Sequence, residues 1–226
     1  MLQPTRLSEV AYKKLRRRIL FQDLQPGALL NEMALVEELG LGRTPIREAI
    51  QRLSREGLVR VLPRRGVLVA EMSPEFLINV YEARAPCEEQ VARCAALRAE
   101  AADIDRMRES LVGVDTLIDE KRFRALVEAD ERFHVAVYQA AKNSVLTNML
   151  MTLYGLGIRF WYSTLASRPA DDVKHEMSLH LRVLEAVEGG DPDKAAHAML
   201  TAIGGFPDRV VEMVRGASRR PWGLQA

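Results

Sequence analysis

Apolar residues recur every three or four positions through most of the first sixty residues, and this spacing predicts three short helices. The predicted helices cover residues 7–21, 32–39 and 43–56. Between the first two, Pro26-Gly27 predicts a turn over residues 24–30. Two short β-rich runs within residues 58–70 flank the sequence Pro63-Arg64-Arg65-Gly66, which predicts a hairpin. The predicted order is therefore three helices followed by a hairpin.

After residue 70 the spacing stays helical and strand-like alternation is absent. The helices predicted there cover residues 74–98, 102–119, 121–141, 144–166, 172–189, 192–203 and 208–215. Gly204-Gly205 and Pro207 are expected to break the chain before the last of them. The predicted fold class is mainly α. A winged helix-turn-helix domain over residues 1–71 precedes an all-helical bundle over residues 72–218, and a tail follows at 219–226.

Basic side chains gather at the start of the third predicted helix and at the tip of the hairpin. Two short helices, a tight turn and a basic hairpin describe a helix-turn-helix with a wing. The second helix of such a pair enters the major groove of DNA, where arginine bonds bidentately to guanine or clamps phosphate. The residues that we expect at the DNA are Arg43, Thr44 and Arg47 on the helix, and Arg64, Arg65 and Gly66 on the wing.

The distribution of charge supports this interpretation, although the whole chain has a net charge of only +1. Residues 1–70 contain 13 lysines and arginines against 7 acidic residues, and the remainder contains 19 against 24. A basic segment joined to an acidic one indicates that the first meets a polyanion. No apolar run approaches the ~18–20 residues of a membrane span, and we expect no membrane partner. Cys87 and Cys94, about 10 Å apart along one helix, cannot form a disulfide. We therefore expect a reduced, cytoplasmic protein.

Polar residues interrupt the apolar stripes of three helices in the second segment. Spacings of three and four residues put Asp130 and His134 on the inward face of one helix, one turn apart. His180 and Arg84 occupy inward positions on two others. Burial of such groups is costly unless they pair with each other, with a metal or with a ligand. Their convergence in one bundle indicates an internal polar cavity.

Each of these residues also has a purely structural interpretation. An inward histidine is usually a hydrogen-bonded core residue, and Asp130 with His134 would be an ordinary pair four residues apart. Arg84 has Glu88 as a local partner. The aromatic residues that either line a pocket or belong to the core or a dimer interface are Tyr154, Phe160, Trp161 and Tyr162.

The sequence LGLGRTPIREAIQRLSREGLVRVLPRRGVLVA at residues 39–70 resembles the DNA-binding signature of the GntR family of bacterial transcription regulators. The resemblance extends over the whole N-terminal domain. One departure is Gly42, where the family usually has serine. Because glycine is a tolerable helix cap, we expect weaker positioning on DNA rather than loss of binding.

Three blocks of the second segment resemble the FadR-type sensor domain, called FCD. They are residues 81–92, 128–146 and 180–199. The resemblance implies a helical bundle that binds a small carboxylate or related metabolite, in many members through a divalent metal held by one aspartate and three histidines. Asp130, His134 and His180 match the first three ligand positions. The fourth falls on Ala202, so the site is incomplete.

His197 is about 140° around the helix from Ala202 and does not obviously replace the missing ligand. Three alternatives stay open. A metal such as Zn²⁺ or another divalent ion binds through the three residues, with water or ligand at open positions. The residues bond directly to an effector, or the site is vestigial.

The sequence therefore predicts a ligand-responsive, homodimeric transcription regulator that binds a double-stranded DNA operator. Repression relieved by a small anionic effector is the commoner behaviour of such proteins. Arg84 is the expected effector-binding residue, because guanidinium bonds carboxylate bidentately. The alternatives are a metal-dependent enzyme built on the helical half and a metabolite-binding protein that no longer binds DNA. Against an enzyme, the sequence shows no separate acid/base pair, no Ser/His/Asp constellation and no glycine-rich phosphate loop.

Overall fold

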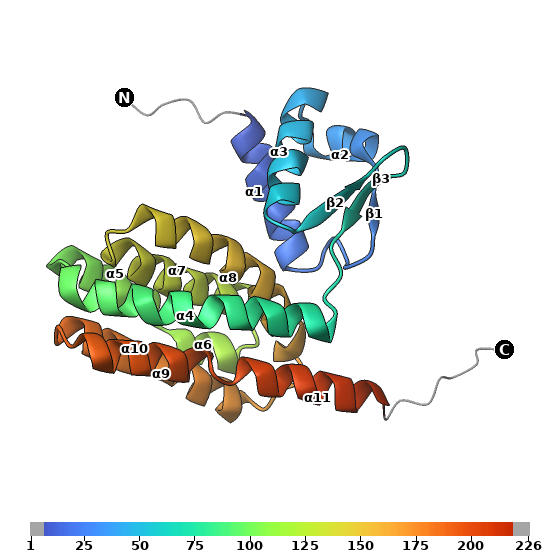
Figure 1. Cartoon of the computed structure of the whole chain (residues 1–226). Helices are drawn as coiled ribbons and strands as arrows, with labels where there is room; N and C mark the ends of the chain where they lie inside the picture. The colour runs from blue at the N-terminus through green and yellow to red at the C-terminus, as the bar shows by residue number, and fades with distance from the viewer. Residues whose placement is uncertain (1–6, 219–226) are drawn as a thin grey trace. The chain divides into compact units, whose positions relative to one another are not determined.

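The chain divides into two compact units, residues 1–72 and 73–226, and the computed structural model describes residues 7–218 (Figure 1). The predicted tail at 219–226 lies outside the described residues. The first unit combines three helices with a small sheet, and the second is all-helical. This confirms the predicted fold class, mainly α with a winged helix-turn-helix before a helical bundle. Within residues 7–218, no helix combines the length and apolarity needed to cross a membrane.

The first unit is built on the apolar faces of its first and third helices. Its elements are α1 (Leu7–Leu20), β1 (Leu29–Leu30), α2 (Glu32–Leu39), α3 (Arg43–Arg55), β2 (Val59–Leu62) and β3 (Gly66–Val69). Leu15 and Ile19 of α1 are fully buried, as is Leu53 of α3, and the two helices pack together. The strands form an antiparallel sheet in the order β1-β3-β2, in which Val67 has neighbours on both sides.

Strand β1 is a correction to the sequence prediction, which placed only a turn over residues 24–30. Leu29 and Leu30 pair with Leu68 and Val67 of β3. The Pro26-Gly27 turn brings the chain back along the edge of β3, as the bond from Gly27 N–H to the Val69 carbonyl at 3.0 Å indicates. Two residues are too short to show alternating polarity, so the sequence carries no strand signal there.

The ends of α2 and the start of α3 follow from individual residues. The Asn31 side chain caps α2 by accepting hydrogen bonds from the N–H groups of Met33 and Ala34 at 2.9 and 3.3 Å. Gly40 ends α2 with φ +64°. Helix α3 begins after Gly42, which contributes no side-chain cap. The turn between the two helices is therefore short and tightly defined.

The second unit surrounds one long central helix. Its elements are α4 (Pro74–Arg98), α5 (Ala101–Ser110), α6 (Val114–Asp119), α7 (Phe123–Ala140), α8 (Ser144–Leu165), α9 (Ala170–Glu188), α10 (Pro192–Ile203) and α11 (Phe206–Ser218). Helix α4 packs against α7, α8, α9, α10 and α11 (Figure 1). Val91 of α4, Phe133 and Val137 of α7, and Met199 of α10 are fully buried in the shared core. Any side chain on the inward face of α4 therefore meets several other helices.

Two predicted helix boundaries in this unit are wrong. The single helix expected over residues 102–119 is divided into α5 and α6, because Gly113 adopts φ +75°, a conformation that ends one helix and starts the next. Helix α11 begins at Phe206 and is longer than the predicted 208–215 segment. Pro207 lies in its first turn, where proline lacks only an N–H that would have no helical partner. Gly204-Gly205 form the break.

Candidate functional sites

The first turns of α3 present the candidate DNA-reading residues. Arg43, Thr44 and Arg47 are exposed, whereas Ile46 and Ile50 are buried against the rest of the unit. The Nε atom of Arg47 lies 2.9 Å from a Glu32 carboxylate oxygen. This ion pair is exposed, so it is weak and can be exchanged for a phosphate or a base. The outer face of α3 therefore offers a basic surface, and its contact with DNA stays a prediction.

The wing carries the remaining candidate DNA contacts. Arg64, Arg65 and Gly66 are exposed at the turn between β2 and β3. The Arg65 N–H donates to the Leu62 carbonyl at 3.1 Å, and Arg64 adopts φ +61°. Gly66 adopts φ +101°, which a side chain would make strained. The turn thus holds two arginines at the tip of the hairpin, where contact with DNA again stays a prediction.

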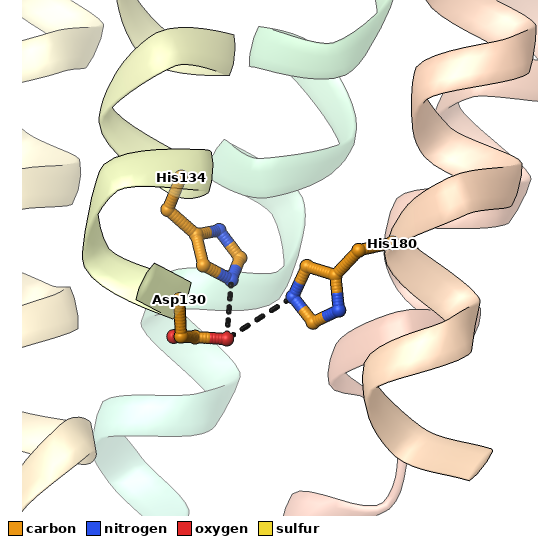
Figure 2. A group of neighbouring side chains, drawn as sticks. All are labelled: Asp130, His134 and His180. Carbon is orange, nitrogen blue, oxygen red and sulfur yellow. Dashed lines mark ion pairs between the residues drawn. The ribbon is translucent and has the colours of Figure 1, made fainter. Parts of the chain in front are cut away.

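In the helical unit, Asp130, His134 and His180 form one buried cluster. Figure 2 shows Asp130 and His134 on successive turns of α7, facing His180 on α9. The Oδ1 atom of Asp130 lies 3.1 Å from Nε2 of His180 and 3.9 Å from Nε2 of His134. The three possible ligand atoms all lie within 4.8 Å of one another. Two imidazoles and a carboxylate at these separations form a potential site for a divalent metal.

The outer atoms of the cluster are held by hydrogen-bond partners. The Tyr154 hydroxyl donates to Oδ2 of Asp130 at 2.7 Å. Nδ1 of His180 lies 3.2 Å from the Met177 carbonyl, which orients Nε2 toward Asp130. Nδ1 of His134 lies 3.4 Å from the Tyr138 hydroxyl. Partners of this kind fix the orientation of metal-binding side chains. Both the three ligands and their surroundings therefore fit a metal.

The charges of the cluster follow from burial and from its own members. Burial raises the pKa of Asp130, but His134, His180 and Tyr154 outweigh that effect and hold the pKa below its ordinary value. Burial lowers the pKa of His134 to about 4. For His180 burial acts downward, and the bond and charge of Asp130 raise the pKa above its ordinary value. Asp130 is therefore an anion and His134 a neutral imidazole at neutral pH, which are the forms that bind metal.

Arg84 lies inside the same unit, bound to Glu88. Its Nε donates to Glu88 Oε1 at 2.7 Å, and the Tyr138 hydroxyl donates to the same oxygen. Glu88 is fully buried, and burial and Glu88 act in opposite directions on Arg84, whose pKa stands above its ordinary value. The local pairing that the sequence allowed is therefore present. Arg84 also lines the cavity described next. Its pairing with Glu88 therefore leaves it within reach of a ligand in that cavity.

A cavity of about 50 Å³ lies against the cluster. Its charged and polar lining residues are Arg84, Asp130, His134, Glu176, His180 and Arg209. Trp161 also lines it, whereas Tyr154 contacts Asp130 and Phe160 is buried outside the cavity lining. Tyr162 is half-buried and lines neither cavity nor core.

Ala202 lines the cavity at the position where the family pattern has its fourth ligand. Neither remaining histidine compensates: His175 and His197 are exposed and are absent from the cavity lining. The structure thus brings three of the four ligand positions together with a methyl group in place of the fourth. The sequence analysis missed Glu176 and Arg209. Neither residue interrupts a predicted apolar stripe, so the pattern gives no sign that they face the cavity.

Two family descriptions match the chain. The family described as bacterial regulatory proteins, gntR family, matches residues 7–69, and the FCD domain matches residues 79–204. The Nta operon transcriptional regulator of Aminobacter aminovorans is 29% identical over 193 residues, which cover 85% of this chain and 89% of that protein. The transcriptional repressor RspR of Escherichia coli is 28% identical over 203 residues, covering 88% and 86%.

Solved structures agree with the sequence relatives on the fold. E. coli McbR/YncC has a TM-score of 0.80 at 18% identity and covers 97% of this chain and 100% of its own. A GntR regulator from Rhodococcus sp. RHA1 has a TM-score of 0.73 at 20% identity, covering 92% and 99%. The two family matches and the names of the sequence relatives are those of transcription regulators. The chain therefore belongs to the GntR family of bacterial regulatory proteins, as a DNA-binding transcription regulator with an FCD domain.

Proposed function

We propose that this regulator is a homodimeric, cytoplasmic repressor whose DNA binding is relieved by a small anionic effector. The observation that carries the proposal is a cavity lined by buried charged groups in the helical unit of a chain whose other unit exposes arginines on α3. The name of RspR, a transcriptional repressor, supports the sign of regulation. A dimer supplies the two winged helices that a two-fold symmetric operator requires.

In this proposal Asp130, His134 and His180 hold a divalent metal such as Zn²⁺. The hydrogen bonds to Tyr154 and to the Met177 carbonyl support it, because they orient the ligand atoms. A bound ion would supply positive charge and open coordination positions for a carboxylate. Arg84 would add a guanidinium on the α4 side. The 3.1 Å contact between Asp130 and His180 supports the alternative in which the effector binds without metal, since the two residues already satisfy each other.

Effector binding would act on DNA through a shift in population between two arrangements of the dimer. The cavity is lined from α4, α7, α8, α9, α10 and α11, so a ligand there changes how these helices pack. A ligand shifts the equilibrium only by its difference in affinity for the two arrangements. The effector therefore has to bind more tightly to the arrangement that does not fit the operator.

The DNA-binding part of the proposal is tested with a fluorescent duplex from the region upstream of the chain's own gene. Arg43→Ala and Arg47→Ala are each expected to cost about 1–3 kcal/mol of discrimination between operator and unrelated DNA, the value of a bidentate base contact. Arg122→Ala, an exposed arginine of the helical unit, is the control. Light scattering should give twice the chain mass of 25.4 kDa. Unchanged operator binding in both α3 variants would contradict the assignment of α3 to the DNA.

A further inference from the structure

A second polar cluster borders the cavity on the side of Ala202. The carboxylate of Glu176 on α9 contacts two arginines, with Oε1 2.9 Å from Nη2 of Arg209 and Oε2 2.5 Å from Nη1 of Arg168. All three side chains are mostly buried, with exposed fractions of 12–18%. One carboxylate therefore serves two guanidinium groups. The cluster retains one positive charge that none of its own members neutralises.

The guanidinium of Arg209 has a space shaped for it. A Cβ atom placed on Gly205 would lie 2.7 Å from its Nη1, so the absence of a side chain at Gly205 is what lets the guanidinium lie there. The Nε atom of Arg209 is buried and has no hydrogen-bond partner among the described residues. The same holds for Nε1 of Trp161, which also lines the cavity. Nη2 of Arg84 and Nε2 of His180 at the same cavity are also buried without a hydrogen-bond partner within residues 7–218, but each lies within 3.1 Å of a carboxylate oxygen. Buried donors without acceptors, such as those of Arg209 and Trp161, are unfavourable.

Arg209 lies between two spaces. Glu176, Ala202 and Arg209 line both the 50 Å³ cavity and a larger outer cleft of about 1,110 Å³. These three residues therefore form the wall between the cavity and the cleft. At Ala202 this wall contains a methyl group instead of a larger side chain.

We propose that Arg209 binds the carboxylate of the effector, with the Trp161 N–H as a second donor, and that the effector enters from the outer cleft past Ala202. This inference rests on the proposed function, because it assigns that effector a contact and a size. A cavity of about 50 Å³ favours a small carboxylate such as acetate or glycolate. Within the cluster of Glu176, Arg168 and Arg209, a single negative charge on the ligand would balance the second arginine. Arg84, by contrast, is paired one to one with Glu88, so it adds a second contact to the ligand and no net charge.

The test is calorimetric titration of the full-length protein, as purified, with acetate and glycolate. Acetamide, the neutral isostere of acetate, and benzoate, which is too large for the cavity, should bind far more weakly. Arg209→Gln is expected to reduce acetate affinity about tenfold or more, the value of a charge-assisted bond. Gly205→Ala and Trp161→Phe should also reduce it, and they remain informative if Arg209→Gln does not fold. Arg182→Gln removes the same charge from the lining of the outer cleft only, and should leave affinity unchanged.

Three results would overturn the assignment of Arg209. The first is wild-type acetate affinity in both Arg209→Gln and Gly205→Ala. The second is binding that EDTA abolishes but Arg209→Gln leaves intact, since the anion would then bind to a metal. The third is the absence of acetate and glycolate binding at millimolar concentration in the wild-type protein. Operator binding without ligand is measured on the same samples. Its retention in Arg209→Gln separates failure of this inference from failure of the proposed regulator.

Discussion

Asp103 is a buried carboxylate that joins α5 to the turn between α7 and α8. Its side chain accepts a hydrogen bond from the Glu100 N–H at 3.0 Å and lies 2.8 Å from Nζ of Lys142, and it also pairs with Arg106. Only 1% of the residue is exposed. Burial raises its pKa, but the Glu100 N–H and Lys142 outweigh burial, so the pKa lies below its ordinary value. The folded state therefore favours the ionised form.

Replacement of Asp103 by asparagine should lower the free energy of unfolding by about 1–3 kcal/mol at neutral pH, since Lys142 and Arg106 lose their anionic partner. Because the folded pKa is depressed, this stabilisation is present above the unfolded pKa of about 4 and is lost as pH falls through the folded pKa. The difference between variant and wild type should shrink in acid. Urea denaturation at neutral and at acidic pH measures the two stability differences. Asp105→Asn, an exposed residue paired with Arg108, is the control and should change little.

Arg84 and Glu88 form a buried ion pair inside the helical unit. Arg84→Ala should destabilise the chain by about 3–5 kcal/mol, because it leaves the buried Glu88 charge without its partner. The double variant Arg84→Met/Glu88→Gln removes both charges and should recover most of that loss. Urea denaturation compares the two. If the single variant is as stable as the wild type, Glu88 has another source of compensation, and the pair is not the stabilising contact.

At the scale of elements, helix periodicity predicted nearly everything that depends on burial. The apolar stripes gave the helices of both units, because a stripe directly records which face is inward. Two features escaped. The division at Gly113 depends on one backbone conformation, and β1 depends on a partner strand almost forty residues away. Neither leaves a periodic signal in its own segment.

The candidate site was predictable on the same terms. Asp130, His134 and His180 stand on apolar stripes, so their inward direction follows from spacing. Arg209 follows Pro207 near the start of a helix whose predicted start was two residues late, and Glu176 is mostly buried. Their meeting depends on how α9 and α11 pack. Packing of that kind is not encoded in the spacing of either helix alone.

The register of α10 makes the missing metal ligand testable. Ala202 faces the cavity beside the three ligands, so Ala202→His should raise Zn²⁺ affinity by about tenfold or more. A competing chromophoric chelator measures the affinity. Ala198→His, one turn earlier on α10 and outside the cavity lining, is the matched control. Equal affinity in the two variants would mean that α10 does not direct residue 202 toward the other ligands.

At the scale of the whole molecule, charge is divided between the two units. The basic segment contributes a salt-sensitive part of DNA affinity, since each phosphate contact releases a bound counterion. Arg64→Gln on the wing should reduce the slope of log affinity against log salt by about 0.9, the value of one phosphate contact. Discrimination between DNA sequences should stay the same. An unchanged slope with altered sequence preference would instead assign Arg64 to the bases. Arg122→Gln, which removes an exposed arginine of the helical unit, is the control.

The polar groups around the cavity come from α4, α7, α9 and α11, which are far apart along the chain. A molecule that bonds to all four helices holds them together, and it binds only the folded state. At a ligand concentration a hundredfold above Kd, binding adds about 2.7 kcal/mol to the free energy of unfolding. For a chain of this size that corresponds to a rise in Tm of about 5–10 °C. A rise in Tm of the protein therefore reports binding of its effector. Heating the protein beside a panel of metabolites can identify that molecule before any promoter is known.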